Sequence, residues 1–232
     1  MGQMKHLWYL MLLVSSSLSA PVSENFAVVG RTSILVQRNQ TATLPCWLSP
    51  PQSAEDMEVR WYLGSENFDN TVMLHNAKSG SQNPLYVGRV SFGLKEATSG
   101  GLKSGDVSLK LVNVTIQDAG VYTCFVSSSG DYGSTTVALG VTETGSPPLL
   151  SAAWKEDNTV EVSCKSEGWY PQPELLWSHQ NKALNINNVK YDRDSTGLYS
   201  AHSWVLVSNS SEISCSVGLT NKVTREARLK LT

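Results

Sequence analysis

Residues 118–124 read DAGVYTC, and this short motif is the strongest local indication of the fold. Tyr122 stands two residues before Cys124, which is the spacing of a tyrosine corner. In that motif the phenol is buried, and its hydroxyl bonds the backbone at a turn between two strands of a β-sandwich. Alternating apolar runs bounded by turn residues recur from about Phe26 to Val141. We therefore expect many short strands and no long helix.

Four cysteines extend the pattern along the chain: Cys46, Cys124, Cys164 and Cys215. Trp61 lies fifteen residues after the first of them, and Trp177 lies thirteen residues after the third. Four cysteines allow three pairings, so the choice rests on this context. The Cys, Trp, Cys order resembles that of immunoglobulin domains, in which the tryptophan packs against a disulfide between two sheets. The resemblance implies disulfides from Cys46 to Cys124 and from Cys164 to Cys215.

Two features predict where the domains begin and end. Lys5 and His6 precede an apolar run, and small residues follow up to Ala20, which is the order of a secretory signal peptide. Residues 144–148 read TGSPP, and the adjacent prolines favour a domain boundary because they interrupt both strand pairing and helices. We expect a signal peptide at 1–20, an immunoglobulin variable-type domain at 21–143, a linker at 144–148 and an immunoglobulin constant-type domain at 149–232.

The two domains are expected to differ in strand number. About sixty residues separate Trp61 from Tyr122, which leaves room for extra strands near 71–75 and 84–87, as in variable-type domains. Only fifty-one residues separate the two cysteines of the second domain, which is close to constant-type spacing. The second domain also lacks the tyrosine corner, because Ile213 stands two residues before its last cysteine.

Several residues are interpreted as structural. Variable-type domains, which the first segment resembles, carry an ion pair at the positions of Arg89 and Asp118 that closes one end of the sandwich. The expected structural residues are Trp61, Arg89, Asp118, Tyr122 and Trp177.

Residues 168–173 read GWYPQP and lead into Trp177. This segment resembles the membrane-proximal domain of butyrophilins and related T-cell costimulatory ligands, a group that includes myelin oligodendrocyte glycoprotein-like proteins. The likeness extends to LPC at 44–46 and GRV at 88–90. It implies an all-β fold of two tandem immunoglobulin-like β-sandwiches, variable-type then constant-type, each with one inter-sheet disulfide. It also makes the peptide bond before Pro171 a candidate for the cis form.

The resemblance further implies a function. It predicts an extracellular protein that binds a protein counter-receptor on lymphocytes and modulates T-cell activation, as a part of immune regulation. The alternative is a homophilic cell-adhesion immunoglobulin protein. Such a protein would form a homodimer through the surface that a counter-receptor would otherwise bind. Similar proteins are mostly membrane-anchored, and the sequence up to Thr232 holds no further apolar run of spanning length. We expect the chain on the external side of the plasma membrane, with an anchor beyond Thr232, or secreted.

Other classes of function find no support in the sequence. Zinc ligands come in close C-x(2-4)-C or H-x(3-5)-H spacings, which do not occur here. Neither a G-x-S-x-G turn nor a glycine-rich phosphate loop between a strand and a helix is present. The net charge of -2 gives no strong field for nucleic acid. We therefore expect no enzyme, and no catalytic residue, metal, cofactor, nucleic-acid partner or small-molecule substrate.

Strand parity selects a candidate partner-binding surface on the first domain. Trp61 and Cys124 should point inward, so their neighbours on the same strands should point outward. The candidate partner-binding residues are Arg60, Tyr62, Phe125 and, on a loop at 127–133, Tyr132. Outward aromatics beside an arginine have the composition of a binding hot spot, although they also suit ordinary cross-strand pairs.

Three N-x-[ST] sequons begin at Asn39, Asn113 and Asn209. Each lies near a predicted strand end or turn, where an asparagine side chain faces solvent. We expect N-glycosylation at all three.

Overall fold

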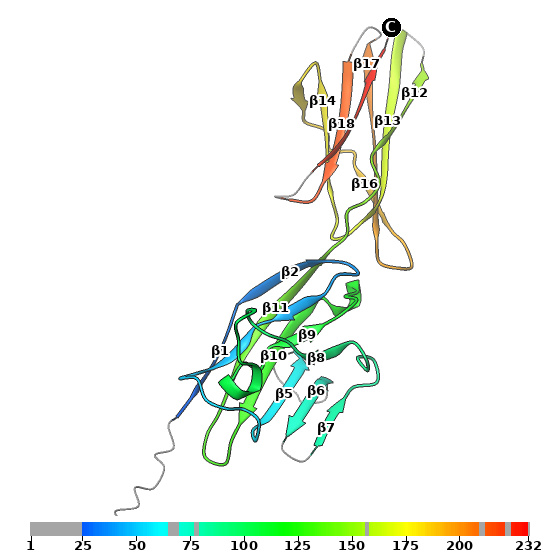
Figure 1. The fold of residues 1–232 in the computed structure, drawn as a ribbon. Helices are drawn as coiled ribbons and strands as arrows, with labels where there is room; N and C mark the ends of the chain where they lie inside the picture. Colours follow the sequence, from blue (N-terminus) through cyan, green and yellow to red (C-terminus); the bar gives the residue numbers. More distant parts are fainter. Residues whose placement is uncertain are drawn as a thin grey trace, which may run out of the picture.

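The computed structural model describes residues 25–64, 70–76, 79–155, 158–208, 212–220 and 224–231. The predicted signal peptide at 1–20 lies outside the described residues. Within them the chain forms strands and short 3-10 helices, which include η2 (Gly101–Ser104) and η3 (Ile116–Asp118). Figure 1 shows the strands in two groups joined end to end, with β1 to β11 in the first domain and β12 to β19 in the second. The predicted all-β fold is confirmed.

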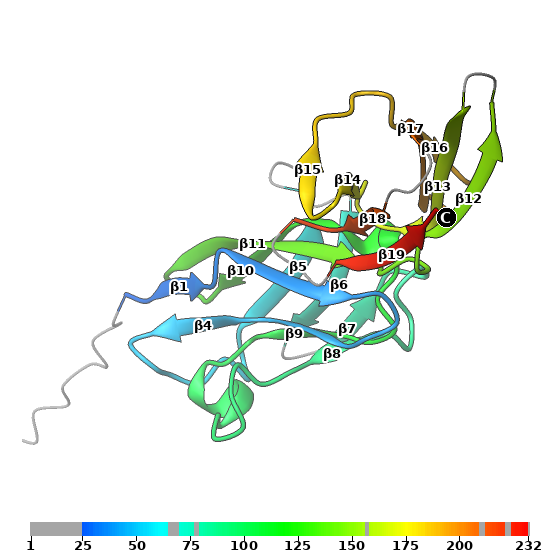
Figure 2. The same ribbon diagram turned by 90° about the horizontal axis from the view of Figure 1, so that it is seen from above.

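The first domain has two layers, which Figure 2 shows from above. One layer is a six-stranded sheet in the order β2-β11-β10-β5-β6-β7, and the other contains the three-stranded sheet β3-β9-β8 and the pair β1-β4. The strands are β1 (Ala27–Gly30), β2 (Ser33–Gln37), β3 (Ala42–Leu44), β4 (Cys46–Ser49), β5 (Glu58–Leu63), β6 (Thr71–Asn76), β7 (Ser79–Gln82), β8 (Val90–Phe92), β9 (Leu109–Leu111), β10 (Gly120–Ser127) and β11 (Tyr132–Thr142).

The two extra strands of the first domain are β6 and β7. The expected strand near 71–75 is confirmed by β6, but the one expected at 84–87 is wrong, because those residues form turns. Asn83 starts this turn, since its side-chain oxygen accepts the N–H of Leu85 at 3.0 Å and its carbonyl accepts the N–H of Tyr86 at 2.8 Å. These local bonds, together with a proline at position 84, outcompete a strand ladder.

The second domain is a sandwich of two four-stranded sheets, β12-β13-β17-β16 and β15-β14-β18-β19. The strands are β12 (Leu149–Trp154), β13 (Thr159–Trp169), β14 (Glu174–His179), β15 (Lys182–Leu184), β16 (Lys190–Arg193), β17 (Tyr199–Ser208), β18 (Glu212–Gly218) and β19 (Arg225–Lys230). The peptide bond before Pro171 is cis, as the resemblance implied.

One disulfide crosses each sandwich, and both predicted pairings are confirmed. The bridges are Cys46–Cys124, between β4 and β10, and Cys164–Cys215, between β13 and β18. A buried tryptophan follows each first cysteine. Trp61 donates its indole N–H to the carbonyl of Val107 at 2.9 Å, and Trp177 donates to the hydroxyl of Ser203 at 2.9 Å. The indole polar groups are thus satisfied inside apolar cores, as burial requires.

The corner between η3 and β10 is closed by polar contacts. The Tyr122 side chain is fully buried, and its hydroxyl donates to the carbonyl of Asp118 at 2.8 Å. Burial raises the pKa of this phenol well above its ordinary value. The Asp118 carboxylate forms an ion pair with Arg89 and accepts the backbone N–H of Thr115 at 2.7 Å. In the second domain Ile213 stands at the position equivalent to Tyr122 and is fully buried. Apolar packing there replaces the hydrogen bond of the tyrosine hydroxyl.

A buried carboxylate fixes the loop before β9. Asp106 accepts the hydroxyl of Ser108 at 2.5 Å, the backbone N–H of Lys95 at 2.8 Å, and the hydroxyl of Ser99. Burial by itself raises the pKa of the Asp106 carboxyl, but these hydrogen bonds outweigh it and hold the pKa below its ordinary value. Asp106 therefore stays charged at neutral pH and ties the loop to the sandwich.

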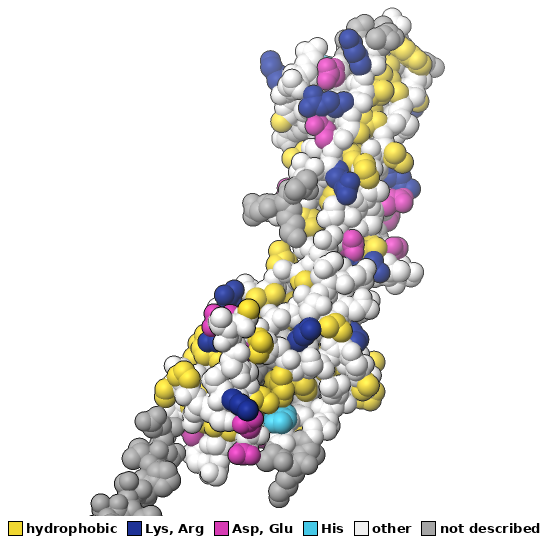
Figure 3. All heavy atoms as spheres, viewed as in Figure 1, with side chains coloured by type: hydrophobic (Ala, Val, Ile, Leu, Met, Phe, Trp, Pro, Cys, Tyr) yellow, Lys and Arg dark blue, Asp and Glu magenta, His cyan; other side chains and the backbone are white. Residues whose placement is uncertain are grey.

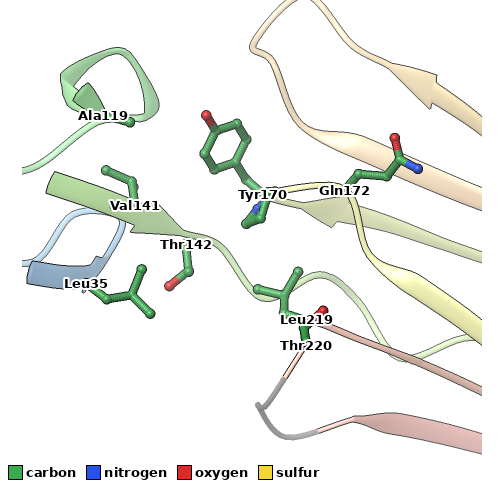
Figure 4. Close-up of a pocket in the computed structure, with 10 residues that line it drawn as sticks. Leu35, Ala119, Val141, Thr142, Tyr170, Gln172, Leu219 and Thr220 are labelled. Atoms are coloured by element: carbon green, nitrogen blue, oxygen red, sulfur yellow. The ribbon is translucent and has the colours of Figure 1, made fainter. Parts of the chain in front are cut away.

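The domains meet at a short antiparallel contact. Glu143 donates its N–H to the carbonyl of Tyr170 at 2.8 Å, and Tyr170 donates its N–H back at 3.1 Å. The Tyr170 ring packs against the core of the first domain, and Figure 4 shows it directed toward Ala119. A pocket of about 370 Å³ lies beside it, between Leu35 of the first domain and Leu219 of the second. The junction is therefore a packed contact between the domains.

The linker itself is fitted onto the second domain. Ser146 donates its N–H to the carbonyl of Glu167 at 2.8 Å and accepts the hydroxyl of Ser166 at 2.7 Å. A Cβ added to Gly145 would stand 2.4 Å from the Glu167 carbonyl oxygen and 2.4 Å from the indole nitrogen of Trp169. Only glycine fits at this point of the linker.

Candidate protein-binding face

A row of outward side chains crosses five strands of the six-stranded sheet. Because Trp61 and Cys124 are buried, their neighbours on β5 and β10 turn to the other face. Facing pairs link the strands in sequence. From β7 to β11 the row consists of Ser81, Leu74, Arg60, Phe125 and Ser134. We call these five residues the central row.

An aromatic pair stands at the β10 to β11 end of the central row. The rings of Phe125 and Tyr132 lie 6.2 Å apart between centroids and are tilted by 32°. Tyr132 is 74% exposed, and it is the first residue of β11, not part of the loop in which we expected it. The preceding Asp131 accepts the N–H groups of Tyr132 and Phe26, each at 2.9 Å. These bonds hold the backbone beneath an exposed ring, so little backbone entropy remains to be lost on binding.

Arg60 contributes a charge whose partner is close by. Its guanidinium bonds the carboxylate of Glu58 at 3.1 Å, and both side chains are partly exposed. Phe125 faces Arg60 across the β5 to β10 ladder. The row therefore places an aromatic ring beside an arginine whose charge is neutralised by Glu58. Arg60 does not create a strong positive field there.

Tyr62 was expected to be an exposed contact residue, and this expectation of exposure is wrong, because the structure buries its side chain to 7% exposure. Its facing residue Thr123 is buried as well, with its hydroxyl donating to the carbonyl of Gly64 at 2.6 Å. β5 lies between β10 and β6, and the β5 to β6 register shifts between Trp61 and Tyr62. Parity gives the direction of a side chain, but neighbouring strands decide how much of it stays exposed.

Leu74 is a member of the row that sequence reasoning missed. Val72 and Met73 are both buried although they are adjacent in sequence, because the register shift breaks strict alternation in β6. Leu74 is thereby brought opposite Arg60. Alternation in the sequence alone gives no signal for such a shift.

Two of the three predicted glycosylation sites are described, and both asparagines are exposed. Asn39 follows β2, and Asn113 follows β9. Asn209 lies outside the described residues. Glycosylation at all three stays a prediction.

Neither a metal-binding group nor a membrane-spanning helix is found among the described residues. No group of three His, Cys, Asp or Glu side chains in the described ranges is placed to hold a metal ion. None of the helices in that part of the chain has the length and apolar character needed to cross a membrane. On the face seen in Figure 3, Lys and Arg side chains are scattered among Asp and Glu side chains over both domains.

Comparison with known proteins identifies the family. The immunoglobulin V-set domain matches residues 29–142, and the Ig-C domain of the butyrophilin subfamily 3 member A2-like type matches residues 144–228. Butyrophilin subfamily 2 member A2 of Mus musculus is 32% identical over 218 residues, covering 91% of this chain and 41% of the mouse protein. The chain belongs to the butyrophilin family. Its variable-type and constant-type domains are both shown by these matches.

Other butyrophilins agree with this assignment. The Homo sapiens butyrophilin subfamily 2 member A2 is 33% identical, covering 88% of this chain and 39% of the human protein. This butyrophilin-family chain thus spans about two fifths of the length of these relatives. The crystal structure of bovine butyrophilin matches with a TM-score of 0.80 at 28% identity, covering 92% of this chain and 100% of that one. A crystal structure of ICOS with ICOS-L matches with a TM-score of 0.69 at 22% identity, which shows a common fold.

Proposed function

We propose that this chain is an extracellular ligand that binds a protein counter-receptor on lymphocytes and thereby modulates T-cell activation. The binding surface consists of the central row together with Tyr132. The observation that carries the proposal is the pair formed by the partly exposed Phe125 ring and the exposed Tyr132 ring beside Arg60, on the broad face of the six-stranded sheet. Relationship to the butyrophilins, a family akin to costimulatory ligands, supports the immune role. The chain acts by binding and catalyses no reaction.

The composition of this surface fits what binding energetics requires. Tyrosine and arginine are enriched among residues that dominate interface energies, and aromatic rings lose little entropy when they are bound. A standard interface covers about 800 Å² on each partner, which the outward face of several strands can supply. The side chains of Ser81 and Ser134 at the two ends of the row are short, and Ser134 therefore leaves space beside Phe125 for a partner's side chain.

A second copy of the chain is the other partner that this face could accept. The homophilic alternative predicts dimers of the isolated ectodomain, and analytical ultracentrifugation at high protein concentration detects them. A strictly monomeric ectodomain that binds lymphocytes supports the counter-receptor. Attachment to the external side of the plasma membrane remains part of our proposal.

The functional test uses a matched pair of serine substitutions on opposite layers of the first domain. Ser134→Glu places a charge in the central row, and Ser91→Glu places one on the exposed face of β8, opposite Lys110. Immobilised wild-type and variant chains are presented to stimulated T cells, and proliferation is measured. We expect Ser134→Glu to abolish the change in proliferation and Ser91→Glu to retain it. Equal activity of the two variants would refute the proposed surface.

A further inference from the structure

Two of the predicted glycosylation sites lie side by side at one end of the first domain. Asn39 donates its backbone N–H to the carbonyl of Val114 at 2.8 Å, and Val114 donates its N–H to the carbonyl of Gln40 at 3.0 Å. These reciprocal bonds join the turn after β2 to the turn after β9. Asn39 and Asn113 are both exposed and both adopt a left-handed backbone, with φ of 66° and 52°. The two acceptor asparagines therefore share one small area of surface.

This area lies at the junction end, away from the aromatic pair. Arg38, just before the first sequon, donates its N–H to the carbonyl of Thr142 at the end of β11. The second sequon precedes η3, which leads into the start of β10, whereas Phe125 and Tyr132 lie at the other end of the β10–β11 hairpin. A strand of eight residues rises about 3.3 Å per residue, so about 20 Å separates the two areas. The two acceptor asparagines are therefore attached well away from the aromatic pair.

The two sequons differ in the exposure and hydrogen bonding of their second and third residues. Residues 39–41 are exposed at all three positions. In the second sequon Val114 is fully buried, and Thr115 donates its hydroxyl to the carboxylate of Asp118 at 2.9 Å. The backbone N–H of Thr115 is bonded to the same oxygen, and Asp118 is itself paired with Arg89. The closed corner thus engages both the middle and the last residue of this sequon.

The chemistry of transfer makes this difference matter. The donor is an oligosaccharide linked to a lipid diphosphate. The asparagine side-chain nitrogen forms a bond to the first sugar carbon, the bond from that carbon to the diphosphate oxygen breaks, and one N–H proton is released. Because only Ser or Thr is accepted at the third position, the transferase must recognise the side-chain hydroxyl of that residue through direct contact. The Thr115 hydroxyl is hydrogen-bonded to the Asp118 carboxylate inside the closed corner. It is therefore not available to contact the transferase.

We propose that Asn113 accepts a glycan only before the first domain folds, whereas Asn39 accepts one in the unfolded and in the folded chain. Closure of the Arg89–Asp118–Thr115 corner ends the period in which Asn113 can be modified. Occupancy at Asn113 then reports how long the first domain stays open, and occupancy at Asn39 does not.

The test compares one protein in two states. Unglycosylated chain with both disulfides formed is incubated with a purified single-subunit oligosaccharyltransferase and its lipid-linked oligosaccharide, and the reduced and alkylated chain is treated in parallel. Peptide mass spectrometry gives the rate at each site. At Asn113 we expect the folded chain to react at least ~30-fold more slowly than the unfolded chain, because the corner must open first. At Asn39 we expect the rates of the folded and unfolded chains to agree within about 3-fold.

An Asn39→Gln variant separates the closed corner from crowding by a neighbouring glycan. With that glycan absent, we expect Asn113 to remain unmodified in the folded chain. Recovery of modification at Asn113 in this variant would show crowding and overturn the proposal. Equal slowing of both sites on folding, or no reaction at Asn113 even in the unfolded chain, would overturn it as well.

Discussion

Replacing Tyr122 with phenylalanine isolates the contribution of one buried hydroxyl to the first domain. The ring remains, so no cavity opens, but the 2.8 Å bond to the Asp118 carbonyl is lost. A hydrogen bond contributes about 1 kcal/mol net, and an unsatisfied buried polar group costs about 1–3 kcal/mol. We therefore expect the free energy of unfolding of this domain to fall by about 2 kcal/mol. At its midpoint this corresponds to roughly 8 °C in Tm.

The assay must distinguish the two domains within one chain. Hydrogen exchange followed by mass spectrometry does so, because peptides from β10 and β18 report opening of the first and second domain separately. Tyr132→Phe is the matched control, since its hydroxyl sits on a side chain that is 74% exposed, and its effect should stay below about 0.5 kcal/mol. The reasoning fails if the two variants are equally stable, or if β18, which has Ile213 in place of this corner, loses as much protection.

Two further predictions concern the linker and the buried carboxylate. Gly145→Ala should destabilise the chain by about 1–3 kcal/mol through overpacking, whereas Gly80→Ala, whose Cβ would lie 3.5 Å from its nearest neighbour, should cost less in the same thermal unfolding scan. Because the folded pKa of Asp106 is lowered, its contribution to stability is present above the unfolded pKa and is lost as pH falls through the folded value. Denaturant titrations between about pH 5 and pH 2 should show a steeper loss of unfolding free energy for wild type than for Asp106→Asn, and parallel curves would contradict this.

The framework of both domains could be predicted from the sequence because a few side chains have demanding surroundings. Cysteine pairs framing Trp61 and Trp177 predicted two sandwiches, since an indole and a disulfide must share a core. Tyr122 marked the corner of the first domain for a similar reason, because its hydroxyl needs a backbone acceptor once the ring is buried.

Much of the candidate face could not be predicted in the same way. Tyr62 is buried among neighbouring strands, and Leu74 joins the central row beside a register shift between β5 and β6; both depend on contacts between strands. Alternation within one strand carries no information on such a shift. The turn at 84–87 replaced an expected strand because local bonds to Asn83 decide the backbone there.

The most direct measurement is the affinity of the ectodomain for lymphocytes after removal of the aromatic pair. Phe125→Ala with Tyr132→Ala is compared with Trp154→Ala combined with Leu206→Ala, a control pair of exposed apolar residues on the second domain. Loss of hot-spot residues typically costs 2 kcal/mol or more, so we expect binding at least ~30-fold weaker for the aromatic variant and nearly unchanged for the control. Wild-type affinity in the aromatic variant, or an equal loss in the control, would contradict binding through the central row.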